Sequence, residues 1–266
     1  MCQSLFATVL PLVFLSSFTE GDSDAPMFVV DSSKHLLTVD VTTGEVSLVG
    51  NMGVQLTDVA FGHNGRLFGV NARFLYEIDP SNGDTTFIGN HGYGESGSSI
   101  GIDALTFGDD GILYGAGDDV LISIDPATGA GTTVGTLSGH RSSGDLAADA
   151  SGRLLLTTDL GYLVEAHRDG SGATLIGSIP NVDVYAFAGN GDGELFGIRS
   201  TGGIVSINGS TGYGSEVGSL QADFPLGAIW GGSFYDQYLP EPATLMLAAF
   251  GAVFCLRRGR RASAHR

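Results

Sequence analysis

Four aspartates recur near the start of a predicted strand in four successive segments of this chain: Asp58, Asp103, Asp145 and Asp183. Carboxylates around one opening could hold calcium or another hard cation, because such ions prefer several oxygen ligands. In pairs, they could act as general acid and base on a glycan. Structurally, each could instead cap a turn or accept hydrogen bonds from the amides of a neighbouring sheet. We expect this structural role, with a weak Ca²⁺ or ligand ring and a catalytic pair as alternatives.

Two glycine motifs have spacings that occur in catalytic or cofactor sites. Residues 92–97, GYGESG, match the G-x-G-x-x-G pattern of dinucleotide sites, and residues 97–101, GSSIG, match the G-x-S-x-G nucleophile elbow. Both motifs require a helix directly after them. No helical period follows here, so the sequence predicts one long loop over 91–101. The six histidines include no H-x-H or H-E-x-x-H pair, and we expect no zinc site and no cofactor other than weak Ca²⁺.

Composition and charge exclude several classes of partner. The chain of 266 residues has a net charge of −17 and 42% hydrophobic residues, which is enough apolar surface for a folded core. Without the residues from Pro240 onward, 28 acidic residues stand against 7 basic ones. Nucleic acids require clustered Lys and Arg, so nucleic acid is not an expected partner, and neither is an anionic membrane surface. Cys2 and Cys255 both lie in terminal apolar segments, so the body has no predicted disulfide.

The segment between residues 26 and 238 is built from a repeat. A polar turn closed by glycine and followed by an apolar strand occurs as HNGRLFGV, DDGILYGA, ASGRLLLT and GDGELFGI. A second signature follows, and LYEIDPSNGDTTFIG and LISIDPATGAGTTVG are its clearest copies among five. The first signature places its glycines 46, 41 and 41 residues apart, at Gly65, Gly111, Gly152 and Gly193. A period of about 40 residues indicates a repeat architecture.

The repeated segments alternate apolar and polar residues. Tyr76 and Ile78 share one face, whereas Glu77 and Asp79 share the other. This period of two predicts antiparallel strands with one buried face, and the Asp-Pro and Thr-Gly segments are turn chemistry. A further strand, such as LTDVAFG, comes ahead of each first signature. Each repeat therefore supplies about four strands, which is the content of a propeller blade.

The two ends of the body are predicted to complete one blade together. The N-terminal copy lacks its leading strand, and FPLGAIWGG, which contains Trp230, is the expected replacement. Such an exchange closes a propeller and removes exposed sheet edges. The body resembles the five-bladed and larger propellers of extracellular bacterial proteins whose blades carry an IDP-x-TG turn. We expect an all-β propeller of about five four-stranded blades, with the aspartate-bearing strands nearest the axis. Six blades or an open β-solenoid are the alternatives.

Residues 1–25 are predicted to be a signal peptide. An apolar run from Leu5 to Phe18 precedes a polar, acidic stretch. This length suits the core of a secretory signal and is short for a membrane span. The run lacks the usual Lys or Arg near Met1 and an Ala-x-Ala cleavage site. A buried element of the domain is the alternative to export.

The last residues, 239–266, combine a Pro-Glu-Pro triplet, an apolar run over 243–256 and an arginine cluster. The run is shorter than the ~20 residues of a full crossing, and the arginines would stay cytoplasmic. This order resembles the PEP-CTERM sorting tail of exported bacterial proteins, which is also labelled an ice-binding protein C-terminal region. The resemblance implies recognition by an exosortase, a membrane-embedded cysteine protease-transpeptidase. An ordinary tail anchor is the alternative. The residues concerned are Pro240, Glu241, Pro242, Arg257, Arg258, Arg260 and Arg261.

The expected organisation is thus a signal peptide (1–25), a β-propeller (26–238) and a sorting tail (239–266) with a transmembrane helix over 243–256. The resemblance implies a location at the cell surface or in the extracellular matrix of a Gram-negative bacterium, after transient anchoring in the inner membrane. Its expected partners are an exosortase and exopolysaccharide, in a biofilm setting. We expect a non-catalytic binding or structural protein. A glycan-active hydrolase or lyase that uses channel-facing aspartates is the alternative function.

Overall fold

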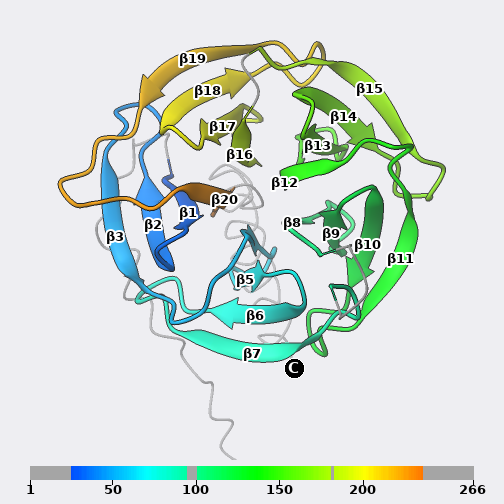
Figure 1. Cartoon of the computed structure of the whole chain (residues 1–266), viewed down its shortest axis with the longest axis horizontal. Coiled ribbons are helices and arrows are strands. Elements are labelled where there is room, and N and C mark those ends of the chain that lie inside the picture. Colours follow the sequence, from blue (N-terminus) through cyan, green and yellow to red (C-terminus); the bar gives the residue numbers. More distant parts are fainter. Residues whose placement is uncertain (1–24, 95–100, 181–182, 236–266) are drawn as a thin grey trace, which may run out of the picture.

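The body of the protein is a ring of five β-sheets around one axis (Figure 1). The computed structural model describes residues 25–94, 101–180 and 183–235. Within these residues every regular element is a β-strand and there is no helix. Each sheet contains four strands, and neighbouring strands within a sheet are antiparallel. The prediction of a five-bladed propeller is confirmed, and the alternatives of six blades or an open solenoid are excluded.

The strands of every blade follow one order from the axis to the rim (Figure 1). Blade 1 contains β20 (Ile229–Phe234), β1 (Met27–Asp31), β2 (His35–Val39) and β3 (Val46–Asn51). Blade 2 contains β4 (Asp58–Phe61), β5 (Leu67–Val70), β6 (Phe74–Ile78) and β7 (Thr85–Asn90). Blade 3 contains β8 (Ala104–Phe107), β9 (Leu113–Gly117), β10 (Val120–Ile124) and β11 (Gly131–Thr136).

Blade 4 contains β12 (Ser142–Ala148), β13 (Leu154–Thr158), β14 (Tyr162–Ala166) and β15 (Ala173–Ser178). Blade 5 contains β16 (Val184–Gly189), β17 (Leu195–Arg199), β18 (Gly203–Ile207) and β19 (Gly214–Ser219). The strands that precede the first signature (β4, β8, β12 and β16) lie innermost, as predicted. The final strand of each second signature lies at the rim.

The first signature forms the hairpin turn between the innermost strand and its neighbour. Its glycines have φ values between 76° and 81°, a left-handed conformation that glycine adopts without a steric penalty. The amide of Gly65 donates to the carbonyl oxygen of Gly62 at 2.8 Å, and the amide of Gly111 donates to that of Gly108 at 3.0 Å. The signature therefore repeats because each blade begins with the same tight turn.

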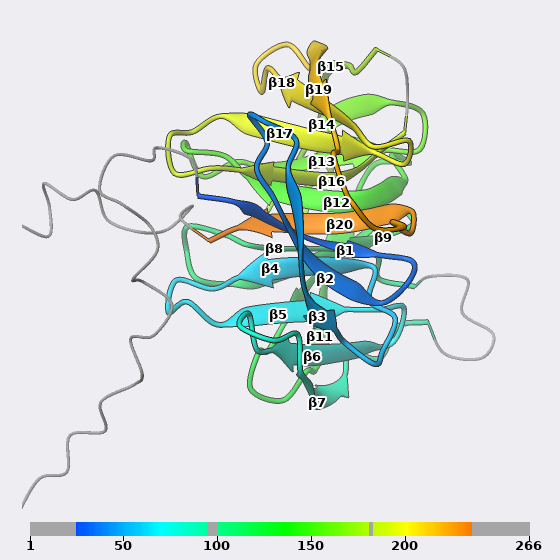
Figure 2. The same ribbon diagram turned by 90° about the vertical axis from the view of Figure 1, so that its left-hand side faces the viewer.

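Blade 1 joins the two ends of the described chain. Strand β20 pairs antiparallel with β1, and Met27 lies opposite Phe234 while Val29 lies opposite Gly232. Figure 2 shows β20, in orange, directly beside the blue β1. The expectation that the segment around Trp230 supplies the missing strand is confirmed. Because this pairing closes the ring, the inner edge of β1 is not left open to another chain.

The hydrophobic core lies between the blades, because each sheet packs its faces against the sheets on both sides. In β1, Met27 and Val29 belong to a cluster shared with blade 5, whereas Phe28 and Val30 belong to a cluster shared with blade 2. Strand β1, the second strand of its blade, is therefore buried on both faces and not on one. Full burial of such a side chain stabilises the fold by about 1.5–3 kcal/mol.

The glycine that ends the second signature marks a close contact between neighbouring blades. A Cβ atom on Gly89 would lie 1.9 Å from the carbonyl oxygen of Thr128, in the turn between β10 and β11 of the next blade. A Cβ atom on Gly50 would lie 1.8 Å from Asn82 in the same way, and one on Gly177 would lie 1.9 Å from Thr211. The rim strand of one blade thus lies against the glycine-containing turn of the next, at a distance that only glycine permits.

We expect Gly89→Ala to destabilise the propeller, because the new methyl group would meet backbone that cannot rotate away. A clash of this kind costs about 1–3 kcal/mol or more, measurable by urea unfolding followed by circular dichroism. Gly218→Ala is the matched control. Gly218 occupies the corresponding position of blade 5, where the nearest neighbour of an added methyl group would be Cδ1 of Ile204, at 3.8 Å. Equal stability of the two variants would contradict the proposed close contact.

Candidate functional site

Two of the four aspartates singled out from the sequence occupy equivalent places at the axis. Asp58 and Asp145 each lie three residues before the last residue of their innermost strands, β4 and β12. One oxygen of each accepts a hydrogen bond from the next amide in its own strand, Val59 or Leu146, at 2.7 Å. The other oxygen of Asp58 accepts from Leu105 of blade 3 at 2.6 Å.

Asp145 makes the same bond to the next blade, where the amide of Phe187 donates to its Oδ2. Both carboxylates therefore join their own strand to an amide of a neighbouring blade, which is the structural role weighed for them. Oδ2 of Asp145 also accepts from Gly232 of β20 at 3.3 Å. Blade 4 and blade 1 are not adjacent, so this bond spans the axis.

Asp58 and Asp145, here called the axial pair, also contact each other. A hydrogen bond joins the two side chains, and neither residue has any exposed surface. Burial raises the pKa of both carboxyl groups well above the ordinary range, and the charge of Asp58 raises the pKa of Asp145 further. Two buried carboxylates in contact cannot both stay ionised at moderate cost, so the pair retains a proton.

The other two aspartates lie in different settings. Asp103 precedes β8 by one residue, and burial raises its pKa to about 6 despite a hydrogen bond from Ser142. Its charge acts on the axial pair by raising the pKa of Asp58. Asp183 lies apart from the pair and accepts a hydrogen bond from the Ser200 hydroxyl at 2.7 Å. The structure thus brings Asp58 and Asp145 together, places Asp103 close to them and leaves Asp183 separate.

This geometry bears on what the aspartates can do chemically. The axial pair has no exposed surface and its oxygens accept backbone hydrogen bonds, so an enzyme that used it would first have to open the axis. No group of three or more His, Cys, Asp and Glu side chains is placed to hold a metal ion within the described residues.

The described ranges also contain no helix long and apolar enough to cross a membrane. The predicted sorting residues, Pro240–Pro242 and the arginine cluster, lie outside these ranges, as do all but the last residue of the predicted signal peptide, 1–25.

A polar groove of about 600 Å³ lies between blades 4 and 5, within the size range of small-molecule sites. One wall is the turn between β12 and β13, from Asp149 to Arg153, and the other runs along β18 to Tyr213. A second hollow of about 470 Å³ shares Ser151 and Arg153 with the groove. No sequence signature predicts this groove, because its walls come from separate repeats. The one signal in the sequence is an aromatic residue, Tyr213, inside a turn signature.

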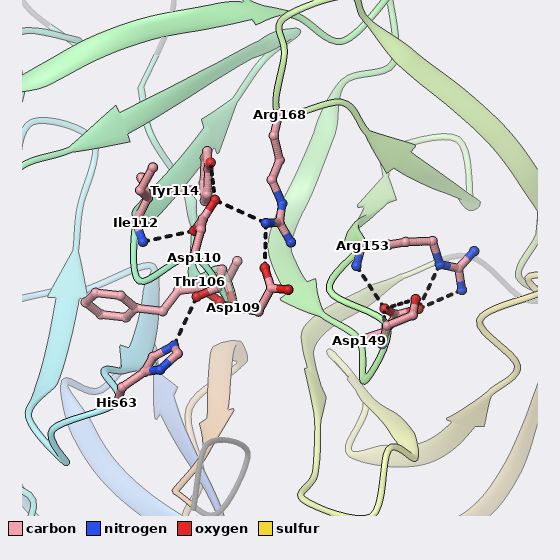
Figure 3. A network of polar contacts seen from close by, with 12 residues as sticks. His63, Thr106, Asp109, Asp110, Ile112, Tyr114, Asp149, Arg153 and Arg168 are labelled. Carbon is pink, nitrogen blue, oxygen red and sulfur yellow. Dashed lines mark hydrogen bonds and ion pairs between the residues drawn. The ribbon is translucent and has the colours of Figure 1, made fainter.

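Arg153 fixes the wall of the groove (Figure 3). Its guanidinium forms an ion pair with Asp149 at 2.7 Å and donates a hydrogen bond to the carbonyl oxygen of Gly209 at 3.0 Å. This single side chain therefore links the turn of blade 4 to the turn of blade 5. Arg168 acts similarly one blade earlier, where Figure 3 shows it between Asp109, at 2.5 Å, and Asp110, at 3.1 Å.

The closed ring and its buried axis define the class of the protein as a five-bladed β-propeller. No family model matches the chain, and no curated protein matches it either. Among solved structures, a chain of a nidogen–laminin complex is 8% identical, with 80% of this chain and 99% of that chain covered and a TM-score of 0.54.

A protein of unknown function from Bacteroides thetaiotaomicron is 13% identical, with 80% of this chain and 66% of that chain covered and a TM-score of 0.52. Virginiamycin B lyase from Staphylococcus aureus is also 13% identical, with 77% of this chain and 72% of that chain covered and a TM-score of 0.43. At these identities the likeness to the first two structures shows the fold alone.

The raised pKa values make stability depend on pH in a defined direction. A group whose pKa is higher in the folded state than in the unfolded state stabilises the fold at low pH, and that contribution is lost as pH rises through the folded-state pKa. We therefore expect the free energy of unfolding to fall from about pH 4, where carboxyl groups of the unfolded chain ionise, to about pH 6, where Asp103 ionises in the folded state. The axial pair, whose pKa values are also raised, should extend the fall until the pair loses its proton. One proton accounts for at most about 1.4 kcal/mol per pH unit.

The measurement is urea unfolding at a series of pH values from about 4 to 9. Asp145→Asn removes one ionisable member of the axial pair, so its curve of stability against pH should be flatter than that of the wild type, whatever its absolute stability. Asp183→Asn is the control, because Asp183 lies apart from the pair. A wild-type slope that persists in Asp145→Asn would show that the axial pair does not titrate in this way.

Proposed function

We propose that this protein is an exported, non-catalytic binding protein of the cell surface or extracellular matrix, sorted through its C-terminal tail and associated with exopolysaccharide. The observation that carries the binding role is the placement of the axial pair. Asp58 and Asp145 are fully buried and hold neighbouring blades together. The axial carboxylates thus contribute to stability, and the groove between blades 4 and 5 is a surface that is open to a ligand.

Composition supports a role outside the cell. The net charge of −17 favours solubility and disfavours attachment to anionic polymers and membrane surfaces. A closed ring of blades is a rigid support for loops that make several weak contacts. Uncharged polysaccharide is compatible with both properties, because its recognition depends on hydroxyl contacts and not on charge.

The order of features in residues 239–261 supports the sorting proposal. A Pro-Glu-Pro triplet, a short uncharged apolar run and four arginines follow one another in the order of a PEP-CTERM tail. In this proposal the arginines stop transfer at the cytoplasmic side, and an exosortase processes the chain near Glu241. The mature propeller is then released or attached at the surface of a Gram-negative bacterium.

The glycan-active alternative requires two carboxyl groups about 5–10 Å apart in an open pocket. The axial pair lacks the open pocket, since both of its residues are fully buried. We therefore favour binding without catalysis for the propeller.

We expect Glu241→Ala to block processing in a host that encodes an exosortase. The full-length chain should then stay in the membrane fraction, whereas the wild type appears as a shorter form at the surface or in the medium. Immunoblotting of cell fractions measures both the size and the location of the protein. Glu216→Ala, an exposed carboxylate on the propeller, should leave processing unchanged. Normal processing of Glu241→Ala would overturn the sorting proposal.

A further inference from the structure

One residue of the groove departs from the repeat in a way that the fold does not require. In every blade the turn at the rim is closed by a backbone hydrogen bond, which in blade 5 runs from the amide of Asn208 to the carbonyl oxygen of Tyr213 at 2.9 Å. The residues that accept this bond in blades 1 to 4 are Glu45, Asp84, Ala130 and Gly172. The turn therefore forms equally well with an acidic, small or absent side chain.

The ring of Tyr213 is also largely open to water. The residue is 62% exposed and lines the groove between blades 4 and 5. A large aromatic surface that packs into no core adds little to folding, because stabilisation by burial scales with the area removed from water. An aromatic ring at the edge of a polar groove suits a ligand that has a flat apolar face and polar edges.

The wall beside Tyr213 offers uncharged hydrogen-bonding groups. Ser206 on β18 and Ser215 on β19 are direct cross-strand partners, and both line the groove together with Asn208 and Ser210. Within the part of the chain that the structure describes, neither the Ser206 nor the Ser215 hydroxyl makes a side-chain hydrogen bond. A hydroxyl can donate and accept at once, so this pair matches a ligand that carries hydroxyl groups.

The charges of the groove exclude an anionic ligand. Its one arginine, Arg153, is paired with Asp149 at 2.7 Å and lies 3.9 Å from Glu165. Glu194 adds a further carboxylate to the lining. The groove therefore has no surplus positive charge, and a phosphate, sulfate or uronate group would meet net repulsion.

We propose that the groove between blades 4 and 5 binds a neutral saccharide, with the ring of Tyr213 stacked on the C–H face of one sugar and the Ser206–Ser215 pair bonded to its hydroxyls. The adjoining hollow, which shares Ser151 and Arg153, extends the site along blade 4. Longer oligosaccharides should therefore bind more tightly than monosaccharides. This inference rests on the proposed function at one point only, namely that exopolysaccharide is the natural source of the saccharide.

The test is isothermal titration calorimetry on the full-length protein in a mild detergent. The probes are the neutral hexasaccharides cellohexaose, maltohexaose and mannohexaose, and the anionic hexasaccharides of alginate and hyaluronate. We expect saturable binding of at least one neutral hexasaccharide and weaker or no binding of the anionic ones. Tyr213→Ala should weaken binding at least tenfold, whereas Tyr213→Phe, which keeps the ring, should bind within about threefold of the wild type.

Phe87→Ala is the matched control, because Phe87 is an aromatic residue of blade 2 with similar exposure, 57%, far from the groove in the ring (Figure 1). This variant should bind as the wild type does. Tyr213→Ala should keep the wild-type melting temperature, whereas Phe87→Ala loses ring contacts with Phe74 and Tyr76 and is required only to remain folded. The proposal is overturned if no neutral hexasaccharide binds up to about 10 mM, if the anionic ones bind more tightly, or if Tyr213→Ala binds normally. A failure to bind saccharide would not affect the sorting proposal. Normal processing of Glu241→Ala would likewise not affect the saccharide proposal.

Discussion

The innermost strands of this propeller impose a constraint that the rest of the structure must satisfy. Each of these strands is paired on one side only within its own blade, so amides on the other side face the axis without a partner strand. Unpaired buried amides cost free energy comparable to a lost hydrogen bond. Asp58 and Asp145 supply the missing acceptors for amides of blades 3, 5 and 1. The two carboxylates that were candidates for a general acid and base therefore join the blades instead.

This structural role of the axial carboxylates is consistent with the placement of the proposed ligand surface away from the axis. Because the blade is repeated five times, the residue type at most positions can be predicted from the equivalent positions of other blades. A residue that departs from its equivalents therefore suggests a role beyond the fold. Tyr213 is such a departure, and it lies where Arg153 already links two blades into one wall. The resulting surface contains the ion-paired Arg153, the cross-strand serines Ser206 and Ser215, and the exposed ring of Tyr213. The repeat alone does not produce this combination.

Much of the fold could be predicted from the sequence, because its signals are local. The glycine turns, the alternation of the strands and the incomplete N-terminal copy indicate the blade content, the strand order and the closing strand near Trp230. The contacts between blades could not be predicted in the same way. The sequence shows Gly89 only as the last residue of a signature, and the position of Thr128 in the next blade is what shows why a methyl group is not tolerated there. The pairing of Asp58 with Asp145 across the axis likewise depends on how the ring closes.

The pairing of β20 with β1 has a further consequence for the order in which the molecule is made. Strand β1 is among the first parts of the body to leave the ribosome, and β20 is the last strand of the described chain. Blade 1 therefore stays incomplete, and the ring stays open, until nearly the whole body has been synthesised. Contacts between residues so far apart in sequence form slowly. Until β20 has been made, the inner edge of β1 has no partner strand, and the growing chain exposes an open sheet edge of the kind that invites wrong pairing.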